Sequence, residues 1–474
     1  MIPTCHDFAA RARAAITDPQ VRRVAALLER NFQNRRAEAV ARLPEFDALR
    51  DRGQAIKDHV LAHLDVYLEQ FEAQVLESGG QVHWCADAGE ARATVLELCQ
   101  RYGAHRIGKS KSMVSEEIGL NAHLAAHGVV PVETDLGEYI IQLRQEPPSH
   151  IIAPAAHLSR QEVAETFRRE HADRPIDRDL DSVAALVDEA RAMLRQTFLD
   201  AEIGLTGANF LVADTGSVVL VTNEGNADLG RALPRVHIVL TTLEKLVPTM
   251  ADAFTLIRLL ARSATGQEMA VYTTIATGSR RPDDGEGPEH FHVVLLDNGR
   301  SALLGTPLHA ALRCIRCAAC LNHCPVYGAV GGHAYGWVYP GPIGAVLSPA
   351  LLGLEEAAPL AHASTLCGRC QDVCPTRIPL PAQLRYWREQ SAALPPRHRG
   401  DRQRRWRLKL WRWLALRPEL YHFLAACAAG LLGLLGRRKG FVRRLPLAGA
   451  WTRGRVLPAS QGKTFQQLWQ ERRG

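Results

Sequence analysis

Seven cysteines stand close together in one stretch of this chain, and their spacing is that of a metal or cluster site. They form two runs, one of pattern C-x2-C-x2-C-x3-C-P and one of pattern C-x2-C-x3-C-P. The runs consist of Cys314, Cys317, Cys320 and Cys324, and of Cys367, Cys370 and Cys374. Two-residue gaps let one wrapped loop present three thiolates to one centre, and Pro325 and Pro375 turn the chain away after each run. Such thiolates predict bound iron or zinc.

The way in which each run ends distinguishes iron from zinc. In bacterial sequences with two iron–sulfur clusters, the last cysteine of each run binds the cluster of the other run. This rule predicts two [4Fe–4S] clusters, the first bound by Cys314, Cys317, Cys320 and Cys374 and the second by Cys324, Cys367 and Cys370. A zinc site needs four ligands and no crossing Cys-Pro, so two copies of that ending favour iron–sulfur clusters and one-electron chemistry.

The second predicted cluster has one cysteine fewer than the first. A complete second run would place a cysteine three residues before Cys367, where the chain has Ser364. The fourth ligand is then Ser364, His362, water or a partner's side chain, or the cluster lacks one iron. We favour a loop role for Ser364, which leaves this ligand open.

Length and composition place the chain among globular proteins of two or three domains. It has 474 residues, 46% hydrophobic and 23% charged, so its sequence is not that of a disordered chain. The remaining cysteines, Cys5, Cys85, Cys99 and Cys427, are scattered and form no disulfide framework. The first residues lack the basic and apolar regions of a signal peptide. We therefore expect a cytoplasmic protein.

Charge is distributed unevenly along the chain. Residues 395–474 contain 19 Lys and Arg against 3 Asp and Glu, whereas residues 1–394 carry a net charge of −9. The basic segment predicts an acidic partner or an anionic membrane surface, and no nucleic acid. The apolar run 421–436 is shorter than the ~20 residues of a membrane span. We expect a buried or interfacial helix there and no transmembrane span, with residues 406–413 as an interfacial element; a basic helix packed on the body is the alternative.

The hydrophobic pattern predicts four regions. We expect a helical segment over residues 1–63, an α/β domain over 64–304, the two-cluster domain over 305–394 and the basic helical segment over 395–474. The predicted strands of the α/β domain are 129–132, 151–153, 210–213, 218–221, 237–240 and 292–296, and its predicted helices include 160–170 and 182–199. Residues 213–217 have the chemistry of a hairpin turn.

Two polar stretches of the α/β region can bind a ligand. Residues 109–113, followed by Glu116 and Glu117, fit a helix start that holds an anion, but a solvated helix start is favoured. Residues 133–139 place three carboxylates after a strand, where α/β sites usually lie, with helix capping as an equal alternative. Ser217 lacks the G-x-S-x-G nucleophile pattern, and no G-x-G-x-x-G or Walker A motif supports a nucleotide site.

These stretches also carry a family resemblance. Residues 109–113, 133–139, 154–157 and 207–217 resemble the LUD domain of lactate utilization proteins, and together with the cysteine runs and residues 332–336 the whole chain resembles the lactate utilization protein B family. The resemblance implies a layered α/β sheet similar to that of CoA-transferases and ribose-phosphate isomerases, followed by an α-helical ferredoxin-like domain. The family's second cluster also has three cysteines, so Ser364 is no departure from it.

The resemblance implies an iron–sulfur electron-transfer subunit of a complex that oxidises L-lactate to pyruvate, rather than a stand-alone enzyme. Its implied partners are A- and C-type companion subunits and an electron acceptor at the membrane, and it assigns no catalytic residue. The alternatives are an iron–sulfur subunit of another 2-hydroxy-acid or glycerol-phosphate oxidase, an α/β catalyst with regulatory clusters, and a scaffold with structural clusters. No Cys-Cys-Gly motif occurs in the chain, so we expect a companion to supply it.

Overall fold

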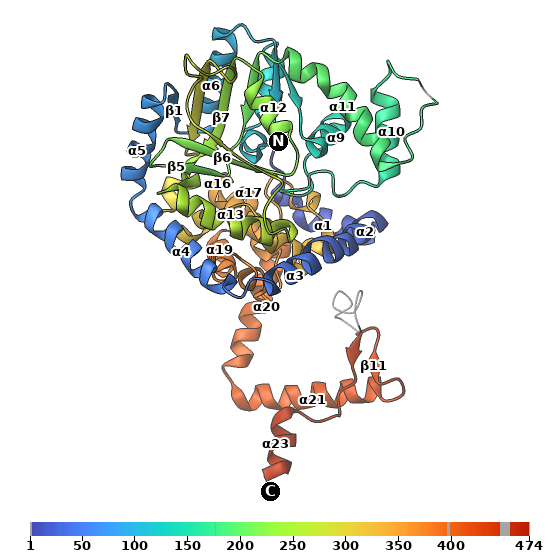
Figure 1. Cartoon of the computed structure of the whole chain (residues 1–474). Coiled ribbons are helices and arrows are strands. Elements are labelled where there is room, and N and C mark those ends of the chain that lie inside the picture. The colour runs from blue at the N-terminus through green and yellow to red at the C-terminus, as the bar shows by residue number, and fades with distance from the viewer. Residues whose placement is uncertain (1, 176, 396–398, 446–455, 474) are drawn as a thin grey trace. The chain divides into compact units, whose positions relative to one another are not determined.

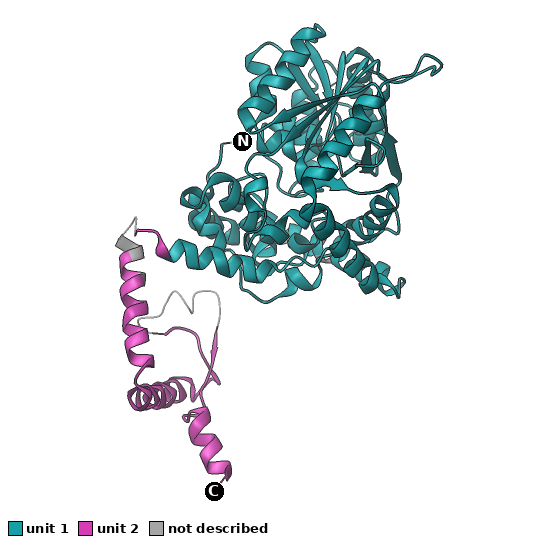
Figure 2. Cartoon of the chain, turned by 90° about the vertical axis from the view of Figure 1, so that its left-hand side faces the viewer, with its two compact units in different colours: residues 1–392 teal, residues 393–474 magenta. Residues whose placement is uncertain are grey.

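The computed structural model describes residues 2–175, 177–395, 399–445 and 456–473. Contacts within the chain divide it into two units, residues 1–392 and 393–474 (Figure 2). The first unit contains the α/β domain and both cysteine runs, and the second contains the basic segment. The division into four regions with boundaries at 63, 304 and 394 stays a prediction.

A six-stranded sheet lies at the centre of the α/β domain (Figure 1). Its order is β1-β10-β7-β4-β2-β3, and every neighbouring pair is parallel. The strands are β1 (Gln81–Cys85), β2 (Arg106–Lys109), β3 (Val130–Glu133), β4 (Ile203–Thr206), β7 (Val236–Thr242) and β10 (His290–Leu296). Every residue of β7 is buried, as expected for a parallel strand covered on both faces. The predicted α/β class is confirmed, and the closer likeness to CoA-transferases stays a prediction.

The two faces of this sheet pack against different elements. Val294 and Leu296 of β10 join a core with helices α6 (Ala88–Arg101) and α8 (Leu120–Ala126). Val293 and Leu295, which alternate with them, join the core of α5 (Leu64–Glu77) and of the cysteine region. One face of the sheet therefore supports the cysteine region directly. The remaining helices of the domain are α7 (Met113–Glu117), α9 (Leu136–Arg144), α10 (Arg160–Glu170), α11 (Val183–Asp200), α12 (Asn226–Ala232) and α13 (Met250–Thr265).

The chain leaves two adjacent strands in opposite directions. After β2 it continues to β3 at the sheet edge, whereas after β4 it continues to β7 on the other side. The connections therefore diverge at the carboxyl ends of β2 and β4 and leave a crevice there. In open parallel sheets, ligands bind at such a switch point.

A second, four-stranded sheet lies beside the first in the order β8-β5-β6-β9. Its strands are β5 (Phe210–Val212), β6 (Ser217–Thr222), β8 (Leu246–Val247) and β9 (Tyr272–Ala276). The predicted hairpin is confirmed, because β5 and β6 pair antiparallel and Val212 faces Ser217 across the turn. Gly216 in this turn has φ 63°, and a Cβ there would lie 2.7 Å from the backbone of Gln74. The turn thus packs directly on α5, which only glycine permits.

Several strand predictions differ from the structure. Residues 151–153, predicted as a strand, form bends, because His150 Nδ1 accepts hydrogen bonds from the backbone N–H of Ile152 and Ala153 and Pro154 follows. The sequence did not predict β1, β2, β4 or β9, which have only four or five residues each; β2 and β4 also contain glycine. The predicted helices at 160–170 and 182–199 are confirmed as α10 and α11.

Helices at the amino end wrap the cysteine region. They are α1 (Phe8–Thr17), α2 (Pro19–Leu28), α3 (Arg35–Ala41) and α4 (Phe46–Ala62), with the 3-10 turn η1 (Cys5–Asp7) before them and the π-helix η2 (Glu29–Asn34) among them. The cysteine region itself consists of loops and short helices: η5 (His309–Arg313), α14 (Ala319–Asn322), α15 (Pro325–Val330), η6 (His333–Tyr335), α16 (Gly341–Leu352), α17 (Leu354–Ala357), η7 (Ala358–His362), α18 (Arg369–Asp372) and α19 (Leu380–Ala393). The turns η3 (Leu243–Lys245) and η4 (Ser301–Leu303) belong to the α/β domain.

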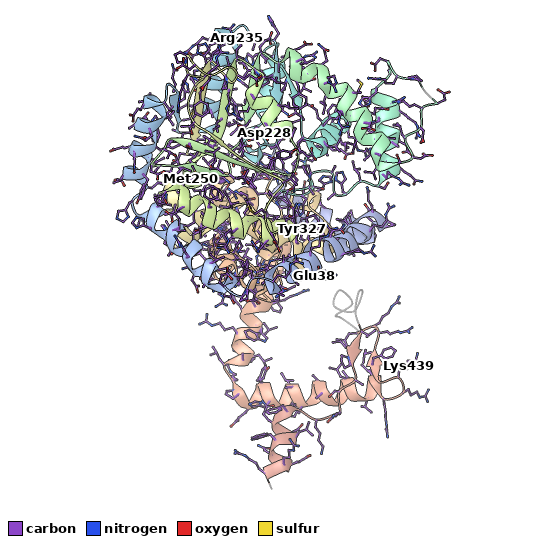
Figure 3. The ribbon with its side chains drawn as sticks, in the orientation of Figure 1. Glu38, Asp228, Arg235, Met250, Tyr327 and Lys439 are labelled. Carbon is purple, nitrogen blue, oxygen red and sulfur yellow. The ribbon has the colours of Figure 1, made fainter. Side chains whose placement is uncertain are left out.

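The second unit contains α20 (Arg399–Ala415), α21 (Pro418–Gly436), the short paired strands β11 (Phe441–Val442) and β12 (Leu457–Pro458), and α23 (Phe465–Arg473). Its basic side chains, Lys439 among them, project from these elements (Figure 3). Helix α21 begins before the predicted apolar run and has 19 residues, so it is the one helix of the described residues that is long and apolar enough to cross a membrane. Gly436 is the only residue of α21 that is buried. The expectation of a helix buried in protein is therefore not met within this unit.

Candidate cluster-binding site and the adjoining cavity

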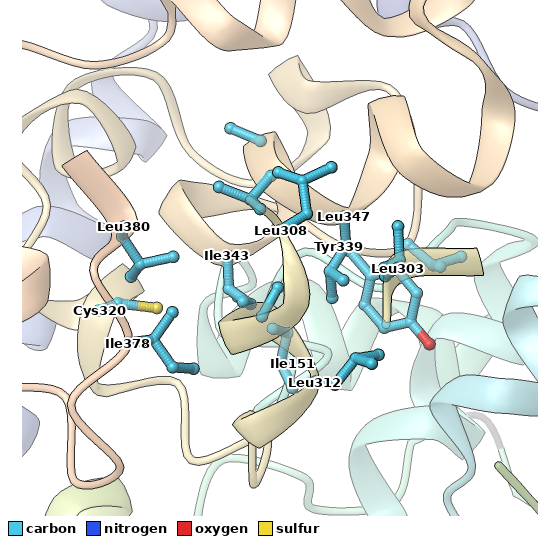
Figure 4. Packing of buried hydrophobic residues seen from close by; sticks show 14 of the residues in the cluster. Ile151, Leu303, Leu308, Leu312, Cys320, Tyr339, Ile343, Leu347, Ile378 and Leu380 are labelled. Atoms are coloured by element: carbon cyan, nitrogen blue, oxygen red, sulfur yellow. The ribbon is translucent and has the colours of Figure 1, made fainter. Parts of the chain in front are cut away.

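Four of the predicted ligands line one small cavity. Cys314, Cys317 and Cys320 of the first run meet Cys374 of the second run there, together with apolar side chains. Figure 4 shows the Cys320 thiol beside Ile378 and Leu380. Cys317, Cys320 and Cys374 are buried, and Cys374 Sγ accepts a hydrogen bond from the backbone N–H of Ile378 at 3.3 Å. An all-thiolate set in an apolar pocket, with an N–H group aimed at sulfur, fits an iron–sulfur cluster.

Both runs wrap with the same backbone conformation. In the first run, Arg316 and Ala318, which flank Cys317, have φ values of 60° and 61°. In the second run, Leu366 and Gly368 flank Cys367 in the same way, with φ values of 55° and 88°. Left-handed backbone at a non-glycine residue costs about 1–2 kcal/mol, so it is retained only where the loop requires it. The repeat aligns Cys317 with Cys367 and so places Ser364 where the first run has Cys314.

The other three predicted ligands lie near one another at a more open site. Burial raises the pKa of the Cys370 thiol to about 12, and the charges of Cys324 and Cys367 contribute in the same direction. Cys324 Sγ caps α15 by accepting a hydrogen bond from the N–H of Tyr327 at 3.5 Å. Cys367 is exposed. The structure thus groups Cys324, Cys367 and Cys370 as the crossing pattern requires, and their ligand role stays a prediction.

The structure gives Ser364 a local role in its loop. Its hydroxyl accepts a hydrogen bond from the backbone N–H of Leu366 at 3.0 Å, and its carbonyl accepts one from Arg388 at 2.6 Å. His362 lies at the end of η7 with an exposed side chain. Among the described residues, no group of three or more Cys, His, Asp or Glu is arranged to hold a single metal ion. The fourth ligand of the second cluster remains open.

Two buried arginines from the amino-terminal helices hold the second run in place. Arg50 of α4 donates to the carbonyl oxygens of Asp372 and Cys374 at 2.7 and 2.9 Å. Arg36 of α3 donates to the carbonyl oxygen of Val373 at 3.1 Å. These bonds satisfy three consecutive carbonyls next to the crossing cysteine and place two positive charges near it. The helical amino-terminal segment is therefore a structural part of the cysteine region.

The glycine- and aromatic-rich insert between the runs joins the cysteine region to the α/β domain. His333 Nε2 lies 2.9 Å from the carbonyl oxygen of Pro147, and the Tyr327 hydroxyl donates to that of Ser149 at 2.8 Å. A Cβ at Gly332 would lie 1.7 Å from the Ser149 carbonyl oxygen, so glycine is required there. The insert is therefore fixed to the loop at residues 147–149 of the α/β domain.

A larger cavity lies at the switch point of the parallel sheet. It has a volume of about 390 Å³ and is lined by the loops that follow β2, β3, β4 and β7. Asn209 after β4 and Lys245 after β7 contribute from the α/β domain, and Arg316 and Tyr339 contribute from the cysteine region. Arg316 also lines the cavity that contains Cys314, Cys317, Cys320 and Cys374. The two cavities therefore share a wall.

The lysine- and serine-rich stretch after β2 is not a solvated helix start, as the sequence analysis favoured. Lys109 is fully buried and its Nζ lies 2.7 Å from Glu133 and 3.3 Å from Glu116. Although burial lowers the pKa of Lys109, these carboxylates raise it above its ordinary value. Ser112 caps α7. The stretch is buried because it lies under the switch-point cavity rather than at the surface.

The predicted carboxylates after β3 have separate roles. Asp135 caps α9 by accepting hydrogen bonds from the N–H groups of Gly137 and Glu138, and it also lines the cavity. Glu133 pairs with Lys109. Burial raises the pKa of Glu138 to about 8. The stretch therefore both caps a helix and lines the cavity, so both alternatives weighed for it apply. Ser217 bonds to Thr277 at 2.6 Å and does not line the cavity.

A network of buried charges extends into the α/β domain from Arg316, which lines both cavities. Arg300 pairs with Glu117 at 2.6 Å and with Glu244 at 3.1 Å. Arg316 pairs with Glu244 at 3.2 Å and stacks on the Tyr339 ring at 4.6 Å. Although burial alone would raise the pKa of Glu244, the charges of Arg300 and Arg316 hold it at about 2. The network fixes the first cysteine loop to the α/β domain.

Sequence reasoning did not single out Lys245 or Arg316. The one available signal for Arg316 was its position, as a cation between two predicted cluster ligands. Lys245 follows a buried strand and belongs to no motif. Lys245 and Arg316 are far apart in the sequence, so only the fold brings them to one cavity.

Comparisons with known proteins agree along the whole chain. Family profiles match in succession: the LUD domain over residues 68–296, the 4Fe-4S dicluster domain over residues 310–378, and the C-terminal family of lactate utilisation protein B over residues 398–474. The uncharacterized electron transport protein YkgF of Escherichia coli (strain K12) is 40% identical over 98% of this chain and 96% of its own. Lactate utilization protein B of Bacillus pumilus (strain SAFR-032) is 40% identical over 98% of this chain and 97% of its own.

A further relative and one solved structure also match this chain. Lactate utilization protein B of Lysinibacillus sphaericus (strain C3-41) is 41% identical over 93% of this chain and 92% of its own. A crystal structure of a DUF162 family protein from Deinococcus radiodurans covers 49% of this chain and 98% of its own at 15% identity. Its TM-score of 0.28 is too low to carry an argument.

Proposed function

This chain belongs to the lactate utilization protein B family, and from that premise we propose that it is the iron–sulfur electron-transfer subunit of a complex that oxidises L-lactate to pyruvate. In this proposal the first [4Fe–4S] cluster is bound by Cys314, Cys317, Cys320 and Cys374, and the second by Cys324, Cys367 and Cys370. The observation that carries the proposal is the meeting of Cys374 with the three cysteines of the first run. This is the crossing arrangement that two-cluster sequences require.

When bound, the clusters supply one-electron transfer, so that a two-electron oxidation can be passed on in single steps. The chain's own residues bind and shield them. Ile343, Ile378 and Leu380 exclude water from the first site. The N–H of Ile378 is aimed at the Cys374 sulfur, and Arg36 and Arg50 add positive charge nearby. Hydrogen bonds and charge of this kind favour the thiolate form of the ligands.

The partners in this proposal are A- and C-type companion subunits and an acceptor at the membrane. Support comes from relatives named for lactate utilization and for electron transport. The exposure of Cys367 supports a second cluster that lies next to solvent and within reach of a partner. The chain is then an electron relay and not a complete oxidase.

The second unit is proposed to attach the complex to an anionic membrane surface. Helix α20 is rich in arginine and exposes Trp406, Trp411 and Trp413, and α21 exposes large apolar side chains such as Phe423 and Leu434. Aromatic and basic residues on such helices suit the interface between headgroups and acyl chains. We place α21 in this interface rather than across the membrane.

The main test is redox titration of the anaerobically purified protein. Iron and sulfide are counted, EPR spectra are recorded before and after dithionite, and L-lactate is added with and without the companion subunits. The proposal expects about seven or eight irons per chain and lactate-dependent reduction in the complete complex. Zinc in place of iron, or clusters that dithionite reduces but lactate does not, would contradict it.

The membrane proposal is tested by sedimentation with vesicles of phosphatidylglycerol or phosphatidylcholine. The full chain is expected to sediment with the anionic vesicles only, and to be released by high salt, because screening weakens surface attraction. Trp411→Ser should weaken sedimentation, whereas the matched control Trp84→Ser, an exposed tryptophan of the first unit, should not. Retention after a high-salt wash at alkaline pH would instead indicate a membrane-spanning α21.

A further inference from the structure

The cavity at the switch point has the size and position of a ligand site. Its volume of about 390 Å³ falls within the range of known small-molecule sites. It lies outside the carboxyl ends of β2 and β4, where the chain connections diverge. Apolar side chains such as Ile152 and Leu260 line part of it, and a few polar groups converge on the rest.

The polar groups at one end of this cavity are cations that lack full compensation. Arg316 Nη1 is buried without a hydrogen-bond partner among the described residues, although Arg316 Nη2 reaches Glu244. Lys245 of η3 also lines the cavity, and burial lowers the pKa of its ammonium group to about 8. Lys245, Arg316 and the neighbouring Arg300 stand against two carboxylates, Glu117 and Glu244. Positive charge is therefore in excess where the cavity meets the cysteine loop.

Lys109 provides a contrast within the same domain. Like Lys245 it is buried, but two carboxylates bind it and raise its pKa. Buried Lys57 is satisfied too, by the backbone carbonyl oxygens of Glu244 and Leu246. A buried cation that serves only the fold has such partners, since an unpaired buried charge is costly. Lys245 and the free Arg316 nitrogen differ because they face an open cavity. They are arranged to bind an anion that enters it.

Carboxylates line another part of the cavity. Asp135 and Glu224 line it and act on Lys111, whose Nζ is also buried without a hydrogen-bond partner. These carboxylates balance Lys111 and repel a second negative group. An anionic ligand is therefore directed away from the β3 side and toward Lys245 and Arg316.

We propose that this cavity binds a small organic carboxylate, a 2-hydroxy or 2-oxo acid, with its carboxylate group on Lys245 and Arg316. A guanidinium and an ammonium at one end of a pocket suit a carboxylate, which accepts hydrogen bonds from both. Arg316 stands between Cys314 and Cys317 and lines both cavities. The ligand is thus bound against the first cluster loop. This inference rests on the proposed function and assigns the substrate site to this chain rather than to a companion.

The test measures binding to the full, cluster-loaded chain without companions. L-lactate, pyruvate and propionate are titrated by calorimetry, and the EPR spectrum of the reduced protein is recorded with and without pyruvate. We expect all three acids to bind, and pyruvate to change the EPR spectrum. Lys245→Gln should weaken binding by at least about tenfold, the effect of one lost charge-assisted hydrogen bond. Lys245→Arg should restore most of it.

The controls separate this inference from the proposed function. Arg258→Gln removes an exposed arginine that pairs with Glu45 and should leave binding unchanged. Arg316→Lys keeps the charge but loses the planar fork, and should weaken binding while iron content stays constant. If Lys245→Gln binds pyruvate as the wild type does, or the chain binds no acid while lactate still reduces the assembled complex, the inference is wrong and the function stands. If the chain binds pyruvate but lactate never reduces the complex, the inference stands and the function fails.

Discussion

The two cysteine runs share one backbone conformation but lie in different surroundings. In the first run, Cys317 and Cys320 are buried, and the intervening loop is fixed to the α/β domain through Arg316. In the second run, Cys370 is buried but Cys367 is exposed, and a serine stands at the position that aligns with Cys314. The same motif therefore produces one enclosed site and one open site. The difference comes from the domain packed against each loop and not from the motif.

This asymmetry suits a relay with a direction. The enclosed site lies against the cavity that we assign to the carboxylate, and the open site faces solvent. Exposure and hydrogen bonding set the reduction potential of iron–sulfur clusters, so the two sites are expected to differ in potential. Electrons would enter beside Arg316 and leave near Cys367.

The largest effect is expected from removing a crossing cysteine. Cys374→Ser should cost the enclosed cluster and Cys324→Ser the open one, because each residue completes the site of the other run. Iron should fall from about eight to about four per chain in each variant, with loss of a different EPR signal. Cys427→Ser, which changes an exposed cysteine of the second unit, is the control and should keep all iron. Loss of the same signal in both variants would contradict the crossing assignment.

A smaller effect is expected from the arginines that hold the second run. Arg50→Ala removes several charge-assisted bonds to the carbonyls of Asp372 and Cys374 and should cost about 2–4 kcal/mol. Arg388→Ala removes bonds to Ala361 and Ser364 at a less buried place and should cost about 1 kcal/mol. The thermal midpoint of the loaded protein measures both. Equal shifts would show that the buried side of the loop is no better supported than the open side.

On exposure to air, the two clusters should lose iron at different rates. The open site, with Cys367 at the surface, is expected to lose iron first, because oxidants and chelators reach it without opening the fold. About half of the iron should leave in a fast phase, and the EPR signal that Cys324→Ser abolishes should disappear with it. A single phase for all iron would remove the distinction between an enclosed and an open cluster.

The sequence predicted features that depend on short patterns of residues better than features that depend on the fold. Cysteine spacing predicted that Cys374 lies with the first run, and turn chemistry predicted the hairpin at residues 213–217, because each signal is a short pattern of residues. Residues 151–153 were predicted as a strand from their apolar side chains, but His150 binds the backbone N–H groups that a sheet would need. Lys109 was expected in solvent, and the structure buries it with Glu133. Charge alone does not tell a buried pair from a solvated one.

The switch-point cavity lay beyond sequence reasoning for a different reason. Lys245 belongs to the α/β domain and Arg316 to the first cysteine loop, and β10 lies between them in the chain. Their approach depends on the strand order, which no periodicity reveals. The LUD resemblance indicated the residues after β2 and β4, but not Lys245 and Arg316, which line the same cavity.

The smallest effect is expected at the missing corner of the open site. Ser364→Ala should leave iron content and EPR spectra unchanged, because the Ser364 hydroxyl already accepts a hydrogen bond from the N–H of Leu366. The lost bond should cost only about 1 kcal/mol of local stability. Cys314→Ala is the matched variant at the aligned position of the first run, and it should lose iron. If Ser364→Ala also loses an iron, the two runs are ligated alike and the open site owes its character to exposure alone.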